Sequence, residues 1–361
     1  MNNLYNSLID LFGSEILGYA LGAAIPLVFV LLFVVVAVYM ERKVSGHMQD
    51  RLGPMRVGWH GVLQTIADLV KLLQKEDIVA DGADKKLFNL APALVFLGSY
   101  AAFAAIPFSS VYIGTGTDLG LFYIAAVSGL VVPGLLMAGW ASDNKYSLYG
   151  ALRTAAQIVS YEIPTAIIIV VIVMLAGTFS LHEISEMQTS SFWNWWILGG
   201  PVSATSLAGK IILIPFMIAA FLIMYISTLA EVNRTPFDLP EAESELISGY
   251  HTEYSGMKFA FFFLAEYANM FAVSAIIATV FFGGYQSPIG YLGNLFGASW
   301  MIPIEQFFWF VAKGIFFVFV QMWLRWTLPR VRIDQLMVLC WKYLIPYAVT
   351  VLIVVGFITI L

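Results

Sequence analysis

The sequence predicts an all-α integral membrane protein of about eight transmembrane helices, with an amphipathic helix in its first cytoplasmic loop. Two observations support this fold class. Of the 361 residues, 60% are hydrophobic and 11% are charged, whereas a soluble domain is about 45–50% apolar and about 25% charged. Apolar runs long enough to cross about 30 Å of hydrocarbon also recur eight times along the chain.

The eight runs are spread evenly and predict a single polytopic membrane domain over residues 1–361, although this length would allow about two or three soluble domains. The first run is too long for a cleaved signal peptide, and no basic segment precedes it, so we expect it to be retained as the first span. The spans are expected near residues 16–40, 88–110, 119–141, 157–179, 209–231, 256–284, 303–327 and 339–361.

The first long loop contains a short segment with apolar residues at helical spacing and polar residues on the rest of its surface. Such a segment is too short and too polar to span a membrane. It fits either the membrane surface or the surface of a partner protein. Its apolar residues are Leu63, Ile66, Leu69, Val70 and Leu73.

Positive charges fall in alternate loops, and this pattern orients the chain. The positive-inside rule places basic loops in the cytoplasm, so eight spans leave both termini outside. Trp193, Trp195 and Trp196 in an outer loop are expected to be interfacial anchors. The basic segments are 41–87, 142–156, 231–258 and 325–342, and the loops without Lys or Arg are 111–118, 180–208 and 285–302.

Several classes of site are excluded by residue content. The single cysteine, Cys340, rules out a disulfide within the chain and a cluster held by several cysteines. The four histidines show no ligand spacing. Nucleotide-binding glycine loops and hydrolase arrangements are absent, and basic residues are too dispersed for nucleic acid. The sequence therefore predicts neither a metal site nor catalytic residues in this chain.

Charged side chains inside expected spans are candidate functional residues, because each costs roughly 2.5–3.5 kcal/mol at a helix centre. Each could instead be half of an ion pair that only holds two helices together. A proton-handling role is the sharper hypothesis, since an apolar setting favours the neutral carboxyl. The residues that stand out are Glu162, Glu231, Glu266 and Lys313.

Pro164 strengthens the case for Glu162. Its ring should displace the Ser160 carbonyl from the helix ladder, which would leave a kink able to hold water beside the acid. A purely structural kink is the alternative. A polar stripe at i, i+4 and i+8 leads into the membrane on this helix, and it consists of Arg153, Gln157 and Tyr161.

The segment 231–253 carries a cluster of acids on the normally basic side. Helix capping explains Asp238 and Glu241. It does not explain Glu245, which shares a helix face with Glu241 and should repel it. We therefore expect a functional cluster, in which neighbouring carboxylates raise one another's pKa. Its members are Asp238, Glu241, Glu243, Glu245 and Glu253.

Four stretches resemble, in order, the NuoH family of NADH-quinone oxidoreductase, which comprises the membrane subunits of respiratory complex I nearest its peripheral arm. The resemblance covers essentially the whole chain. The stretches are ERKVSGHMQDRLGPMRVGWHGVLQTIADLVKLLQKED (41–77), GWASDNKYSLYGALRTAAQIVSYE (139–162), EVNRTPFDLPEAESELISGYHTEYSGMKFAFFFLAEY (231–267) and LPRVRIDQLMVLCWK (328–342).

The resemblance implies a membrane component of a proton-translocating NADH:quinone reductase that holds no redox centre itself. Such a protein forms most of the chamber for ubiquinone or menaquinone, and it begins the charged path that couples quinone reduction to proton translocation. FMN and iron–sulfur clusters belong to partner subunits. The implied partners are the peripheral-arm iron–sulfur and quinone-site subunits, the adjacent membrane-arm subunits and the lipid bilayer, with no nucleic acid.

The resemblance also implies roles for particular residues, and it assigns none to Glu266 or Lys313. The quinone-chamber and docking positions are Arg42, Arg51, Asp68, Arg153 and Arg234. The proton-coupling positions are Glu162, Glu231, Asp238, Glu241, Glu243, Glu245 and Glu253.

Two alternatives remain. One is the equivalent subunit of a membrane-bound hydrogenase-type or other-donor complex, against which the long match over 231–267 argues. The other is a proton-coupled secondary transporter, since intramembrane acids alone would allow it. The large inner loops favour a docked partner instead. The extended outer loops favour a bacterial plasma membrane over a mitochondrial inner membrane.

Overall fold

A computed structural model describes residues 4–112, 114, 116–189, 191–201, 207–239, 243–295 and 297–360. Within these ranges the regular elements are helices, and no strand is present. Eight helical segments are long and apolar enough to cross a membrane. The structure therefore confirms the predicted all-α membrane fold.

The spans follow one another along the chain with short helices between them. They are α2 (Glu15–Met48), α4 (Lys85–Ala101) with a 3-10 turn at Ala102–Ala104, α5 (Gly120–Ser128) with α6 (Val131–Ala141), α7 (Lys145–Ala176), α9 (Leu207–Glu231), α11 (Gly256–Phe281), α13 (Ile302–Thr327), and α14 (Ile333–Val338) continued by a π-helix (Leu339–Leu344) into α15 (Ile345–Ile360). The shorter helices are α1 (Leu4–Phe12), α3 (Gln64–Gln74), α8 (Leu181–Met187), α10 (Glu243–Leu246) and α12 (Leu292–Leu295).

Two helices start earlier than the apolar runs indicate. Helix α7 begins at Lys145 rather than near 157, because the Asn144 side chain caps it by accepting a hydrogen bond of 2.9 Å from the Tyr146 amide. It ends at Gly177, whose φ of 71° is the left-handed conformation typical of a helix terminus. The last span begins at Ile333 rather than 339. The polar residues before both apolar runs are thus helical as well.

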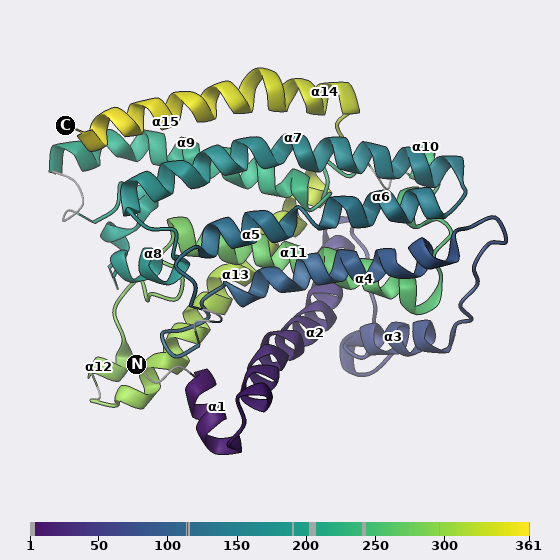
Figure 1. Cartoon of the computed structure of the whole chain (residues 1–361), viewed down its shortest axis with the longest axis horizontal. Helices are drawn as coiled ribbons and strands as arrows, with labels where there is room; N and C mark the ends of the chain where they lie inside the picture. The colour runs from purple at the N-terminus through teal and green to yellow at the C-terminus, as the bar shows by residue number, and fades with distance from the viewer. Residues whose placement is uncertain are drawn as a thin grey trace.

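The long helices run between two ends of the molecule (Figure 1). Helices α3, α10 and α14 lie at one end, and α1, α8 and α12 lie at the other with both chain termini. The basic segments therefore gather at the end marked by α3, as the positive-inside pattern predicts. Helix α2 is tilted against the others.

Helix α11 is the centre of the bundle, because it is the most buried of the spans. Its Phe271 is fully buried and packs against Phe33, Phe103 and Phe310. Gly314 of α13 allows this packing, since a Cβ there would lie 2.8 Å from the Phe271 ring. Helices α11 and α13 are thus held close together.

The amphipathic helix expected in the first inner loop is α3. It packs against α2 and α11, and its Thr65 is buried. Its apolar residues Ile66, Leu69, Val70 and Leu73 are exposed. This apolar face is therefore free to meet lipid or a partner.

The expectation that the three tryptophans are interfacial anchors is wrong for two of them. Trp193 is 69% exposed, but Trp195 is 6% exposed and Trp196 is fully buried. The loop folds inward at Gly200, whose φ is 76° and whose Cβ position would lie 2.3 Å from the Trp196 ring. The lack of a side chain at this glycine lets the indole pack inside the protein.

Candidate functional site

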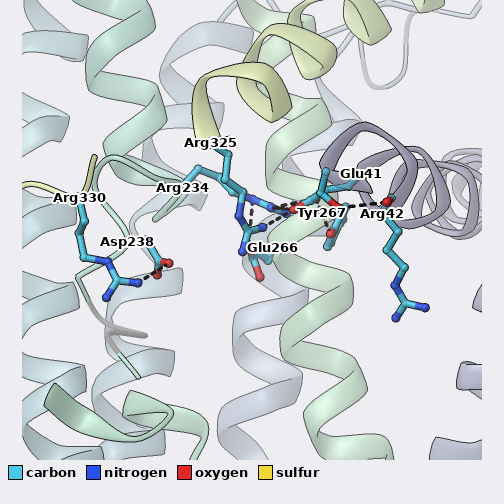
Figure 2. A network of polar contacts seen from close by, with 9 residues as sticks. Glu41, Arg42, Arg234, Asp238, Glu266, Tyr267, Arg325 and Arg330 are labelled. Atoms are coloured by element: carbon cyan, nitrogen blue, oxygen red, sulfur yellow. Dashed lines mark hydrogen bonds and ion pairs between the residues drawn. The ribbon is translucent and has the colours of Figure 1, made fainter. Parts of the chain in front are cut away.

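The Glu41 carboxylate is the centre of a buried network at the inner end of α2 (Figure 2). Arg234 Nη1 donates to both of its oxygens, at 2.9 and 3.0 Å. The Tyr267 hydroxyl donates to Glu41 Oε2 at 2.6 Å, and Arg325 Nη1 donates to Oε1. A buried carboxylate with three donors is a satisfied one, so the site holds its charge without contact with water.

Arg234 joins Glu41 to Glu266. Its Nε lies 3.0 Å from Glu266 Oε1, although the N–H is not aligned for a hydrogen bond. Its guanidinium lies 4.5 Å over the Tyr267 ring. Burial by itself would lower the pKa of Arg234. The nearby carboxylates of Glu266 and Glu41 outweigh this effect, so the pKa lies well above its ordinary value. The guanidinium therefore stays charged.

The turn after α9 places Arg234 in this network. Gln157 of α7 fixes the turn, because its Nε2 donates to the carbonyls of Ala230 at 2.7 Å and Phe237 at 2.8 Å. Asn233 adopts the left-handed conformation with φ of 55°, which asparagine tolerates better than most residues. The polar stripe predicted on α7 therefore acts here through Gln157.

Asp238 lies in a second pair beside the network, with its Oδ2 at 3.2 Å from Arg330 Nη2. Its other oxygen, Oδ1, is buried without a hydrogen-bond partner in the described part of the chain. Burial raises the pKa of Asp238, and the nearby Arg330 and Arg325 offset this only in part, so the pKa lies above its usual range.

Glu162 and Glu231 face each other deeper in the membrane. The Thr165 hydroxyl donates to Glu231 Oε1 at 2.7 Å. Glu162 Oε1 is buried and has no hydrogen-bond partner among the described residues. Both carboxyls line the same cavities. The two glutamates that the sequence singles out as charges within expected spans thus lie at shared cavities, and their role in proton handling stays a prediction.

Four cavities share lining residues in sequence from the Glu41 network to this pair. A cavity of about 110 Å³ is lined by Glu266, Tyr267 and Arg325. One of about 20 Å³ follows, and it is lined by both Glu266 and Glu231. Cavities of about 40 and about 210 Å³ are lined by both Glu231 and Glu162. A cavity needs roughly 10–15 Å³ to hold a water, so each can contain at least one.

The carbonyl beside Pro164 is satisfied by the protein. The Cys340 thiol lies 3.1 Å from the Ser160 carbonyl oxygen. The Tyr161 hydroxyl donates to the Leu336 carbonyl at 2.9 Å, next to the π-helix. The kink in α7 is therefore packed against the irregular turn in the last span. Of the two interpretations of Pro164, this contact favours the structural kink.

Two expected chamber residues pair at the inner surface. Arg42 Nη1 lies 2.5 Å from Asp68 Oδ2, and Gln64 donates to Oδ1 at 3.1 Å. Burial would raise the pKa of Asp68, but the hydrogen bonds from Arg42 and Gln64 outweigh it and hold the pKa below its usual range. Arg42 points away from the Glu41 network (Figure 2). Arg51 is exposed in the turn after α2.

The acidic segment meets several partners. Glu245 Oε2 accepts from Arg153 at 2.6 Å, and Glu253 Oε1 accepts from Asn144 at 2.6 Å. Together with Asp238 and Arg330, this gives each of three acids a separate partner. Glu241 lies outside the described residues, and Glu243 is described only as the first residue of α10.

Sequence reasoning missed three members of the network, Glu41, Tyr267 and Arg325, and also Arg330, the partner of Asp238. It left Glu266 without a role. Glu41 follows the expected end of the first span at 40 and was therefore counted with the loop. Arg325 lies inside the expected span 303–327, so the rule for intramembrane charges could have found it. Tyr267 carries no comparable signal.

Comparison with known proteins identifies the family. A family model described as NADH dehydrogenase matches residues 21–356. A protein of Chlorobaculum tepidum is 53% identical over 336 residues, which cover 92% of this chain and 90% of the relative. Proteins of Chlorobium luteolum (52% over 357 residues, 96% and 92% covered) and Bacteroides thetaiotaomicron (45% over 337 residues, 93% and 89% covered) are also similar. All three are named as the H subunit of NADH-quinone oxidoreductase. This chain is a multi-pass membrane protein that belongs to the NADH dehydrogenase family, with these H subunits among its relatives.

Proposed function

We propose that this chain is the membrane subunit of a proton-pumping NADH:quinone oxidoreductase that forms most of the quinone chamber and the first part of the proton-coupling path. The observation that carries the proposal is the series of cavities from Arg325 and Glu266 to Glu231 and Glu162. It joins a charged chamber to a membrane-embedded pair of acids. The names of the relatives support the reaction.

The cavity of about 110 Å³ has the chemistry that a quinone head group needs. Phe259, Phe262 and Phe263 supply an aromatic wall, while Glu266 and Arg325 supply charge at one side. Ligand sites are mostly apolar with a few placed polar groups. The substrate is ubiquinone or menaquinone, and this cavity forms the membrane side of a chamber that partner subunits complete.

Reduction of a quinone takes two electrons and two protons. We propose that the electrons come from FMN and iron–sulfur clusters in partner subunits, so this chain supplies positioning, charge and protons. Glu41 and Glu266 face Arg234 and Arg325, so the formal charges of the network balance. In a buried network, an added charge must be met by movement or by proton uptake.

The response to quinone reduction then passes along the carboxyls, from Glu266 to Glu231 and Glu162. Glu266 lines the first two of the four cavities, Glu231 the last three, and Glu162 the last two. Asp238 is a further member of the path at the inner edge, because its Oδ1 is buried without a hydrogen-bond partner among the described residues. The acidic segment with Glu245 and Glu253, and with Glu241 and Glu243, adjusts its protonation or position when the quinone is reduced.

The inner face is the docking surface for the peripheral-arm subunits. Arg42, Arg51, Asp68 and Arg153 lie there on α2, the turn after it, α3 and α7. The adjacent membrane-arm subunits and lipid cover the sides of the bundle. The bacterial source of the similar proteins supports a place in the plasma membrane of a bacterium, with this face toward the cytoplasm.

The test is to tag the chain, purify it in mild detergent and identify what accompanies it. Flavin and iron–sulfur absorbance with inhibitor-sensitive NADH:quinone reductase activity is the expected result. Iron–sulfur absorbance with nickel and hydrogen-linked activity would instead place the chain in a hydrogenase-type complex. A colourless single polypeptide that drives proton-coupled solute uptake would contradict the proposal outright.

A further inference from the structure

The outer end of α11 is held by a lysine from the neighbouring helix. Lys313 of α13 donates to the backbone carbonyls of every second residue from the cap of α11 onward. Its Nζ lies 2.7 Å from Phe282 O, 2.9 Å from Gly284 O and 2.6 Å from Gln286 O. The ammonium also lies 4.6 Å from the centre of the Trp195 ring. All three N–H groups of Lys313 are thus used.

Gln188 also contacts this end of α11. It is fully buried, and its Nε2 donates to Thr279 O at 2.7 Å. Its Oε1 accepts from the amides of Gly283 at 2.8 Å and Trp196 at 3.3 Å. The last carbonyls of a helix lack partners within that helix. Gln188 donates to the Thr279 carbonyl in the last turn of α11, and Lys313 donates to the carbonyl of the cap residue Phe282 and to two carbonyls of the turn that follows.

A half-buried lysine is an expensive way to satisfy carbonyls, because a charged side chain inside a membrane costs several kcal/mol where a neutral donor would serve. Among the described residues, no carboxylate lies within ion-pair distance of Lys313. Its counter-charge is the negative end of the α11 dipole together with the three carbonyls. The contact therefore depends on where α11 ends.

The same helix carries the working residues of the proposed site. Glu266 and Tyr267 contact Arg234 and Glu41. From Glu266 to Thr279 is 13 residues of uninterrupted helix, or about 20 Å. A helix of this length transmits a shift or rotation at one end to the other, because its hydrogen bonds are all internal.

We propose that Lys313 is a positioning residue: its ammonium fixes the depth and rotation of α11 and so holds Glu266 and Tyr267 against Arg234 and Glu41. This inference rests on the proposed function of that network. Lys313 transfers no proton in this role, since its three N–H donors are held by carbonyls.

The test uses the whole complex with Lys313→Met, which keeps the length of the side chain and removes its charge and donors. The matched control is Lys210→Met, because Lys210 is buried and donates to one outer-loop carbonyl, that of Trp193. NADH:ferricyanide activity counts assembled complexes. Quinone reductase activity per complex should fall about two- to tenfold in Lys313→Met, the size typical of residues that modulate a distant site, and stay unchanged in Lys210→Met.

A double-mutant cycle with Glu266→Gln separates positioning from a local structural role. Residues about 20 Å apart that act independently give effects that multiply. If Lys313 acts through Glu266, the double variant should be scarcely worse than Glu266→Gln alone. If Lys313→Met accumulates too poorly to measure, Lys313→Gln, which retains two donors without the charge, replaces it with the same expectation.

Three outcomes would overturn the inference. One is a loss of assembled complex with unchanged quinone reductase activity per complex, which indicates a purely structural lysine. The second is a double variant whose loss equals the product of the single losses. The third is normal quinone reductase activity and normal pumping in Glu266→Gln alone, which would contradict the proposed function of the network and this inference with it. An impaired Glu266→Gln with multiplying effects contradicts only the role of Lys313.

Discussion

The Tyr267 hydroxyl donates a 2.6 Å hydrogen bond to the Glu41 carboxylate, across 226 residues of sequence. It joins the central helix α11 to the inner end of α2. The same phenol ring lies under the Arg234 guanidinium. Tyr267 therefore contacts both charges of the pair that the network is built on, and its two contacts can be separated by substitution.

Tyr267→Phe keeps the ring under Arg234 and removes only the hydroxyl. A hydrogen bond to a charged group contributes about 1.5–3 kcal/mol, so we expect a clear loss of thermal stability in the purified complex. Tyr225→Phe is the control, because its hydroxyl is also buried but donates to a neutral carbonyl at 3.4 Å. Equal losses in the two variants would show that the Glu41 contact has no special weight.

Arg234→Met should be far more damaging than its size suggests. It removes the cation closest to Glu266, and it leaves Arg325 as the remaining ion-pair partner of Glu41 among the described residues. Breaking a buried ion pair from one side costs about 3–5 kcal/mol. We expect little or no assembled complex, measured by native electrophoresis of membranes. Asp77→Asn, which breaks the more exposed pair with Lys258, should assemble normally, since surface pairs contribute about 0.2–1 kcal/mol.

The positions of the spans could be predicted from sequence because hydrophobic length is a local property of the chain. The structure confirms the class of fold, and it also confirms the amphipathic helix α3. The starts of α7 and of the last span were placed too late, because hydropathy does not register a polar helical turn outside the membrane. The burial of Trp196 depends on a loop that folds back at Gly200, which no local pattern reveals.

The site could be predicted only where a charge lay inside an apolar run. Glu162 and Glu231 were found in this way, and the structure brings them together at shared cavities. Glu41 and Arg234 could not be paired from sequence, because their contact spans 193 residues and depends on the turn that Gln157 holds. Side-chain pairing between distant helices is a property of packing, and composition does not encode it.

His251 should make stability depend on pH. Burial lowers its pKa to about 4, whereas an unfolded histidine titrates near 6.5. The folded state therefore binds fewer protons, so stability is full above about pH 6.5 and is lost as pH falls toward 4. Between pH 7 and pH 5 the transition temperature of the complex should fall less in His251→Asn than in the wild type. The control His47→Asn, at an exposed position, should match the wild type. A wild-type slope in His251→Asn would contradict the buried neutral histidine.

Cys340 should be replaceable by serine but not by valine. The thiol faces the Ser160 carbonyl at 3.1 Å beside the Pro164 kink. Serine keeps a donor, while valine leaves the carbonyl unsatisfied at a cost of about 1–3 kcal/mol. Thermal unfolding of the complex should rank the wild type and Cys340→Ser above Cys340→Val. Adding Pro164→Ala, which restores an amide donor to the helix, should reduce the loss in Cys340→Val. Equal stability of the valine and serine variants would show that the thiol contact contributes nothing.

Glu245→Gln tests the acidic segment with little risk to the fold. Its pair with Arg153 is exposed on the carboxylate side, at 58%, and such pairs contribute only about 0.2–1 kcal/mol. We expect normal assembly and normal NADH:ferricyanide activity, with a loss of quinone reduction or of proton pumping. Asp77→Asn is the matched control, because Asp77 pairs with Lys258 at 2.8 Å and is 52% exposed at the same face. Pumping should be measured per electron in proteoliposomes. If Glu245→Gln pumps as many protons per electron as Asp77→Asn and reduces quinone at the same rate, Glu245 has no part in coupling. The path would then begin at the Glu41 network instead.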